Sequence, residues 1–160
     1  DQFPHVPVIA SGGIGNGKDL ARILDAGADG AWIGTRLLAT HECIEVTASF
    51  KAQLIKAEAS NTFYTALFDQ TNHVVFGGKP WPAGIAARLI RNEMTATWDD
   101  KIPELLQDTK ALEKYRREMK AQNLDYTPLY AGTSVASVTS VQYVADVLQE
   151  IARDAQAVID

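Results

Sequence analysis

The stretch Val6-Pro7-Val8-Ile9-Ala10-Ser11-Gly12-Gly13 decides the fold class of this chain. Its first six residues are nearly all apolar, which is typical of a short parallel strand covered on both faces. A glycine-rich loop follows at 12–17, residues 18–26 carry apolar side chains at helical spacing, and residues 28–34 predict a second short buried strand. A strand, glycine loop, helix and strand in this order indicate an α/β fold with parallel strands joined by a right-handed crossover.

Both predicted strands end in residues suited to a phosphate. Gly12 and Gly13 end the first strand, and Gly34 and Thr35 end the second. A bound phosphate needs several backbone N–H groups around it, and glycine allows that close approach. In (β/α)₈ barrels the phosphate site commonly uses the loops after the seventh and eighth strands, which fits two consecutive glycine turns one helix apart. Tight turns without a ligand are the alternative.

The rest of the chain predicts mostly helices. We expect a helix over 41–60, an extended segment over 62–68, a loop over 72–84, a helix over 85–98, one or two charged helices over 100–122, a loop over 127–134 and a last helix over 139–158. In that last helix the predicted buried face is Val144, Leu148, Ile151, Ala155 and Val158.

Composition narrows the function classes. The chain has 160 residues, 46% of them hydrophobic, and 15 Lys+Arg against 20 Asp+Glu give a net charge of −5, which argues against nucleic acid or an anionic membrane as the main partner. Because a (β/α)₈ barrel typically needs ~250 residues, the chain is too short for a complete one. The first residues show neither an initiator Met nor a signal-peptide pattern, so we expect a piece of a longer, cytoplasmic protein. The single cysteine, Cys43, suits a reducing compartment.

Several blocks of sequence resemble a known family. Residues 7–14, 26–30 and 33–40 look like the nitronate monooxygenase (2-nitropropane dioxygenase-like) flavoproteins, and the resemblance continues weakly at 78–80 and 89–92 and returns at 128–135. IMP dehydrogenase-like enzymes and FMN-dependent enoyl-reductases share the glycine turns of the first blocks. The pattern at 128–135 favours the nitronate monooxygenase group.

The resemblance implies the C-terminal part of a (β/α)₈ TIM barrel that binds FMN without a covalent bond. Gly13, Gly34 and Thr35 match positions that hold the FMN phosphate, and Gly12 is a neighbour in the same turn. Arg36 either adds charge to this site or points into the protein. Residues 1–40 would then supply the last two strands and the phosphate loops, 41–125 a mostly helical insertion on the substrate side, and 126–160 the return loop and the final barrel helix.

For the intact enzyme the resemblance implies oxidation of alkyl nitronates by O₂. The flavin-ring contacts and the catalytic histidine of the family lie in the half that this chain lacks, so we place no catalytic base and expect the chain alone to be inactive. Two alternatives stay open. One is a related FMN barrel that reduces an enoyl thioester with a nicotinamide; the other is a non-catalytic fragment or subunit that needs a second chain to complete the barrel.

Other reactive residues favour structural roles. His5 is expected at the surface, His41 at the start of a helix and His73 in a solvated loop. Cys43 follows Glu42 near a predicted helix start and is expected to be structural. Trp81, between two prolines, either lines a small-substrate pocket or packs on the following helix. No His, Cys, Asp or Glu grouping has metal-ligand spacing, so we predict no metal.

Overall fold

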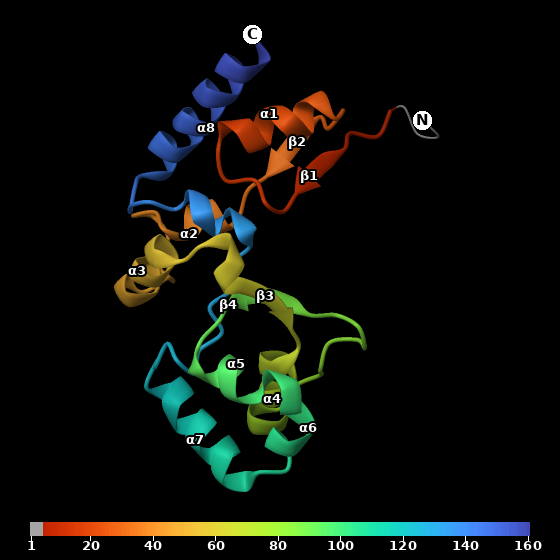
Figure 1. The fold of residues 1–160 in the computed structure, drawn as a ribbon, viewed down its shortest axis with the longest axis vertical. Helices are drawn as coiled ribbons and strands as arrows, with labels where there is room; N and C mark the ends of the chain where they lie inside the picture. The colour runs from red at the N-terminus through yellow and green to blue at the C-terminus, as the bar shows by residue number, and fades with distance from the viewer. Residues whose placement is uncertain (1–4) are drawn as a thin grey trace. The chain divides into compact units, whose positions relative to one another are not determined.

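The computed structural model describes residues 5–160, which form two compact units (Figure 1). The first unit comprises the chain up to Ala59 together with Ala131–Asp160, and the second unit comprises Ser60–Tyr130. Residues 41–59 therefore group with the first unit. Each unit has its own buried residues and is described separately.

The first unit begins with the predicted strand–loop–helix–strand arrangement. Strand β1 (Ile9–Ser11) pairs in parallel with β2 (Gly30–Trp32), with Ile9 opposite Gly30, and α1 (Gly17–Asp25) connects them. Asn16 caps α1, because its side-chain oxygen accepts a hydrogen bond of 3.0 Å from the Asp19 N–H. The α/β class is thereby confirmed.

The expectation that both strands are covered on both faces is wrong for this chain. Each strand has only three residues, and Ile9 and Trp32 are 53% and 71% exposed. The apolar run that predicts a buried strand is present, but the described residues supply no layer over these side chains.

The remaining helices of the first unit start later than predicted. Helix α3 (Ala48–Lys56) begins after Thr47, whose hydroxyl accepts the Phe50 N–H, so residues 41–47 are turns and not helix. Helix α8 (Val144–Ile159) likewise begins five residues after the predicted start at Thr139. The first unit also contains the short helix α2 (Thr35–Leu38), before α3, and the 3₁₀ turn η3 (Thr133–Ser137), before α8.

Helices α1 and α8 pack closely through small residues. A Cβ on Gly17 would lie 2.4 Å from the Ala155 backbone nitrogen, so the two helices approach as far as glycine allows. The buried face of α8 consists of Val147, Ile151 and Ala155. Of the predicted face, Leu148 and Val158 are therefore wrong, being 45% and 55% exposed.

The second unit is built on an antiparallel pair. Strand β3 (Thr62–Thr65) pairs with β4 (Ala87–Ile90), with Thr62 opposite Ile90. The helices are α4 (Leu67–Phe76), α5 (Glu93–Trp98), α6 (Ile102–Leu105) and α7 (Thr109–Lys120), with the 3₁₀ turns η1 (Ala59–Asn61) at the unit boundary and η2 (Asp99–Lys101) before α6. Their shared core is Leu67, Phe68, Val75, Leu89, Met94, Leu105, Tyr115 and Tyr126.

Two sequence predictions are wrong in the second unit. Residues 72–76 belong to α4 and not to a loop, because that helix ends only at Gly77, whose N–H donates to the His73 carbonyl. Residues 85–98 are not one helix. Their first part is β4, which pairs with β3, and α5 starts only after Asn92, which forms a capping box with Thr95.

Candidate functional site

The turn after β1 contains two glycines in a backbone conformation that favours glycine. Gly12 and Gly13 have φ angles of +92° and +73°, the left-handed region that glycine adopts without strain. A Cβ on Gly12 would meet nothing within 4 Å, and one on Gly13 would lie 3.4 Å from the Thr133 hydroxyl. The backbone at Gly12 is therefore open to an approaching group.

The turn after β2 is open in a different way. Gly34 has a φ of −116°, which any residue can adopt, yet a Cβ there would also meet nothing within 4 Å. The carbonyl of Gly34 accepts the Leu37 N–H at 2.9 Å, which fixes the first turn of α2. Glycine at this position is thus required by neither strain nor packing within the described residues.

A third segment connects the two turns and was not among the predicted site residues. The N–H of Gly132 donates to the Thr35 hydroxyl at 2.8 Å, and Thr133 lies against Gly13 as described above. The Thr35 hydroxyl accepts this bond and keeps its own proton for another acceptor. The structure therefore brings Gly13 and Thr35 together around Gly132 and Thr133. The Gly-Thr-Ser sequence at 132–134 was the available signal.

Arg36 points into the protein and does not extend the glycine turns. It is 1% exposed, its Nη2 donates to the Gln142 side-chain oxygen at 2.6 Å, and the same nitrogen lies 3.6 Å from Glu150. Its Nε and Nη1 atoms are buried and find no partner among the described residues. A buried guanidinium held by two residues near and in α8 fixes α2 against that helix.

The histidines and the cysteine do not gather into a catalytic group. His41 is exposed and its ring packs on Tyr143 with centroids 4.5 Å apart, His5 is exposed, and Cys43 is half-buried. His73 lies in α4 and not in a loop, which corrects the sequence assignment. Within residues 5–160 no three His, Cys, Asp or Glu side chains lie together as metal ligands would.

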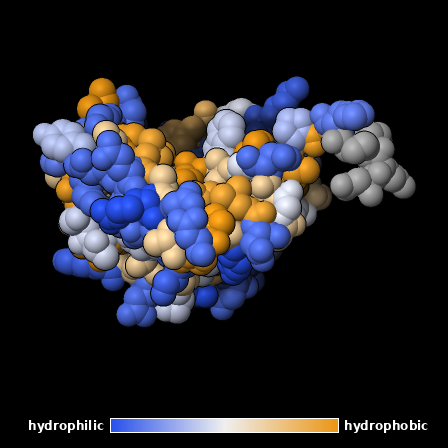
Figure 2. Space-filling view, turned by 90° about the horizontal axis from the view of Figure 1, so that it is seen from above, coloured by the Kyte–Doolittle hydropathy of each residue, from blue (hydrophilic) through white to orange (hydrophobic). Residues whose placement is uncertain are grey.

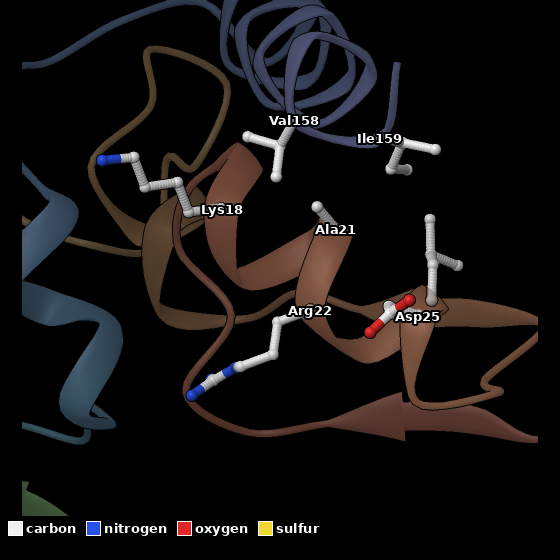
Figure 3. Close-up of a pocket in the computed structure, with 7 residues that line it drawn as sticks. Lys18, Ala21, Arg22, Asp25, Val158 and Ile159 are labelled. Carbon is white, nitrogen blue, oxygen red and sulfur yellow. The ribbon is translucent and has the colours of Figure 1, made fainter.

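A groove lies between α1 and α8, as Figure 3 shows. Ala21 faces Val158 and Ile159 across it, whereas the charged ends of Lys18 and Arg22 extend in different directions. Small-molecule sites normally have a few convergent polar groups on an apolar wall. Because the charged side chains diverge, this groove has the character of a helix-packing surface.

Apolar side chains also reach the surface of the first unit. Figure 2, which views the molecule from the side of α1 and α8, shows apolar residues among the hydrophilic ones. Val8, Ile9 and Trp32 on and beside the strands are all more than half exposed. Neighbouring exposed apolar side chains of this kind are typical of interaction surfaces. No helix among residues 5–160 has the length and apolar character needed to cross a membrane.

In the second unit, two tyrosines have altered acidity. Burial raises the pKa of Tyr115, and the nearby Tyr130 raises it further; the Tyr115 hydroxyl donates to Asn72 at 2.7 Å. Burial also raises the pKa of Tyr130, and the negative charge of Asp69 adds to this effect. Both phenols therefore keep their protons to higher pH than an exposed tyrosine.

Known proteins that resemble this chain agree on one family. A nitronate monooxygenase named npaC from Metarhizium robertsii is 28% identical over 96% of this chain and 43% of its own length. A probable nitronate monooxygenase from Staphylococcus saprophyticus is 31% identical over 81% of this chain and 34% of its own length. The chain thus spans less than half of each of these relatives.

Solved structures share the fold. Nitroalkane oxidase from Streptomyces ansochromogenes superposes with a TM-score of 0.71 at 24% identity, over 98% of this chain and 41% of that one. FabK from Thermotoga maritima superposes with a TM-score of 0.68 at 22% identity, over 99% of this chain and 47% of that one. The sequence profile of the family described as nitronate monooxygenase matches residues 2–154. Because that match covers almost the whole chain, this protein belongs to the nitronate monooxygenase family of oxidoreductases.

Proposed function

We propose that this chain is the FMN-binding C-terminal portion of a (β/α)₈-barrel enzyme that oxidises alkyl nitronates with O₂. The observation that carries the proposal is the pair of glycine turns at the carboxyl ends of neighbouring parallel strands, β1 and β2. Ligands of parallel α/β folds bind at that end of the strands. Family membership supports the same interpretation.

The residues present fit a phosphate. Gly12 and Gly34 leave open the space that a Cβ would fill, and Gly13 lies beside the Thr133 hydroxyl. Gly12, Gly13, Gly34 and Thr35 would hold the FMN phosphate, with the Thr35 hydroxyl donating its free proton to a phosphate oxygen. When bound, FMN supplies the electron chemistry, and this chain's part is to hold its phosphate end.

The test is FMN binding by the intact enzyme with Gly34→Leu. Because Gly34 has a φ that leucine adopts and open space at its Cβ, the substitution should leave the fold intact and block only an approaching ligand. Ala26→Leu is the matched control, since Ala26 is exposed at the end of α1, before β2. We expect the Gly34→Leu enzyme to lose at least tenfold in FMN affinity. Unchanged FMN affinity with an unchanged fold would contradict the assignment of Gly34 to the phosphate site.

Nitronate oxidation itself needs a separate assay. Consumption of an alkyl nitronate with O₂, without NAD(P)H, is expected of the intact enzyme. Consumption of NAD(P)H with an enoyl thioester would favour the related reductase activity and would contradict the nitronate proposal. The two assays leave the phosphate assignment unaffected, because both activities would use the same glycine turns.

A partner segment is also proposed. The exposed apolar side chains around β1 and β2 need a covering layer, which the remaining strands and helices of the barrel would supply, from the same polypeptide or from a second chain. An absorption spectrum and intact mass of the purified protein test this. A flavin band with a single 160-residue chain would contradict the need for such a segment.

A further inference from the structure

A cavity of about 350 Å³ lies in the second unit, between α4 and the loop that follows it. Its volume falls within the range of small-molecule sites. The walls include Asp69, Gln70 and His73 from α4, Trp81 and Ile85 from the loop, and Leu106 after α6. The cavity thus combines an indole and several aliphatic side chains with the polar side chains of Asp69, Gln70 and His73.

The loop is tied to the helix that forms the opposite wall. The backbone N–H of Trp81 donates to Asp69 Oδ2 at 3.0 Å, and His73 Nδ1 donates to the Gly78 carbonyl at 2.8 Å. Gly77 and Gly84, at the two ends of the loop, both have positive φ angles that favour glycine. These contacts hold Trp81 in the cavity wall. Its side chain is 42% exposed and does not belong to the core of the second unit.

The charged and hydrogen-bonding groups of the cavity wall indicate which kind of ligand it can bind. Asp69 is the acidic residue of its wall, and the wall contains no Lys or Arg among the described residues. Asp69 Oδ1 has no hydrogen-bond donor within residues 5–160, whereas Oδ2 holds the loop. His73 uses Nδ1 for Gly78, so its other nitrogen is left as an acceptor when the ring is neutral. The cavity therefore offers acceptors and negative charge, and it disfavours anions.

We propose that this cavity binds a planar aromatic cation, with its ring against the Trp81 indole and its N–H groups directed to Asp69. A cation on the face of tryptophan is attracted by the ring quadrupole, and a carboxylate with a free oxygen accepts a charge-assisted hydrogen bond. This site is independent of the proposed nitronate oxidation, because a nitronate is an anion and the wall carries the same sign of charge.

The test compares three ring compounds of similar size with different charge. Benzamidine is cationic, benzyl alcohol neutral and benzoate anionic at pH 8, where histidine side chains are in general neutral. Binding to the full chain is followed by amide NMR shifts of residues 66–85 and by calorimetry. We expect saturable binding of benzamidine at millimolar concentration, at least tenfold tighter than that of benzoate. Equal affinity for benzoate, or no binding of benzamidine, would overturn the proposal.

Variants distinguish the two roles of Asp69, which carries a negative charge and also holds the loop through the Trp81 N–H. Asp69→Asn keeps an oxygen that accepts the Trp81 N–H and removes the charge, so benzamidine binding should weaken about tenfold while benzyl alcohol binding is unchanged. Asp100→Asn, at an exposed aspartate outside the cavity wall, is the control for net charge. Trp81→Ala should weaken binding of all three compounds. Equal loss in the two Asn variants would show a general charge effect and contradict a site at Asp69.

Discussion

The two units differ in how their cores are built. The first unit joins two stretches that are far apart in the sequence, and its buried residues are mostly small, such as Ala21, Val147 and Ala155. The second unit is one continuous stretch with large buried side chains, including Phe68 and Tyr115. The glycine turns therefore lie in the first unit, where helices α1 and α8 approach closely and apolar side chains on β1 and β2 are exposed. The second unit buries its core with its own residues.

The largest expected effect is on the second unit. Leu67 is fully buried among large side chains, so Leu67→Ala should lower the free energy of unfolding by about 3 kcal/mol through lost burial and a cavity. Hydrogen exchange read by mass spectrometry should speed up within residues 60–130 more than elsewhere. An equal increase of the exchange rate in both units would mean that they unfold together. It would contradict the view that each unit is stabilised by its own core. Val74→Ala, at a half-exposed position of α4, is the control.

The next effect is on the first unit. A Cβ on Gly17 would lie 2.4 Å from the Ala155 nitrogen and 2.5 Å from Asp154 backbone, so Gly17→Ala must separate α1 from α8. We expect a loss of about 2 kcal/mol from overpacking, although alanine favours a helix interior more than glycine does. Faster exchange should appear in α1 and α8 and not in residues 60–130. A Gly17→Ala variant with a higher free energy of unfolding would show that α1 and α8 can accept a Cβ at this position, and it would contradict the prediction.

The first unit is also where sequence reasoning succeeded. The strand, glycine loop, helix and strand were predicted because their signals are local: an apolar run, a glycine-rich loop and apolar residues at helical spacing in residues 18–26. The Gly12–Gly13 and Gly34–Thr35 turns follow from the same pattern. Gly132 and Thr133 were missed as neighbours of those turns, because their proximity depends on the return of the chain after the whole second unit.

Errors in the second unit have a different cause. Residues 87–90 form a strand because they pair with β3, a contact that helical periodicity in the sequence does not report. Residues 72–76 were assigned to a loop because of the Gly and Pro that follow, but α4 continues to Phe76 and ends at Gly77. Pairing with β3 therefore determines the structure of residues 87–90. The position of the glycine that ends the helix determines that of residues 72–76.

A smaller effect is expected from Tyr115→Phe in the second unit. At pH 7 the variant should lose about 1 kcal/mol, because Asn72 loses its hydrogen-bond donor. Burial raises the pKa of Tyr115 above its value in the unfolded chain, so this phenol stabilises the fold fully below about pH 10 and less as the pH rises beyond it. The phenylalanine variant lacks that alkaline loss. Urea unfolding at pH 7 and pH 11 should therefore show that the difference in unfolding free energy between variant and parent becomes smaller at the higher pH, and a constant difference would contradict the raised pKa of Tyr115.

The smallest effect is a shift in acidity without a measurable loss of fold. Burial is the main cause of the raised pKa of Tyr130 and the charge of Asp69 the second, so Asp69→Asn should lower that pKa only part of the way to the ordinary tyrosine value. NMR titration of ¹³C-labelled tyrosine rings, with Tyr130→Phe for assignment, measures the change.

An unchanged Tyr130 pKa in the Asp69→Asn variant would contradict an effect of the Asp69 charge on this phenol. It would also weaken the case for a negative cavity wall beside Trp81. A Tyr130 pKa that moves part of the way would show that two side chains of the second unit influence each other within one continuous stretch of chain, whereas the contacts of the first unit join two distant stretches.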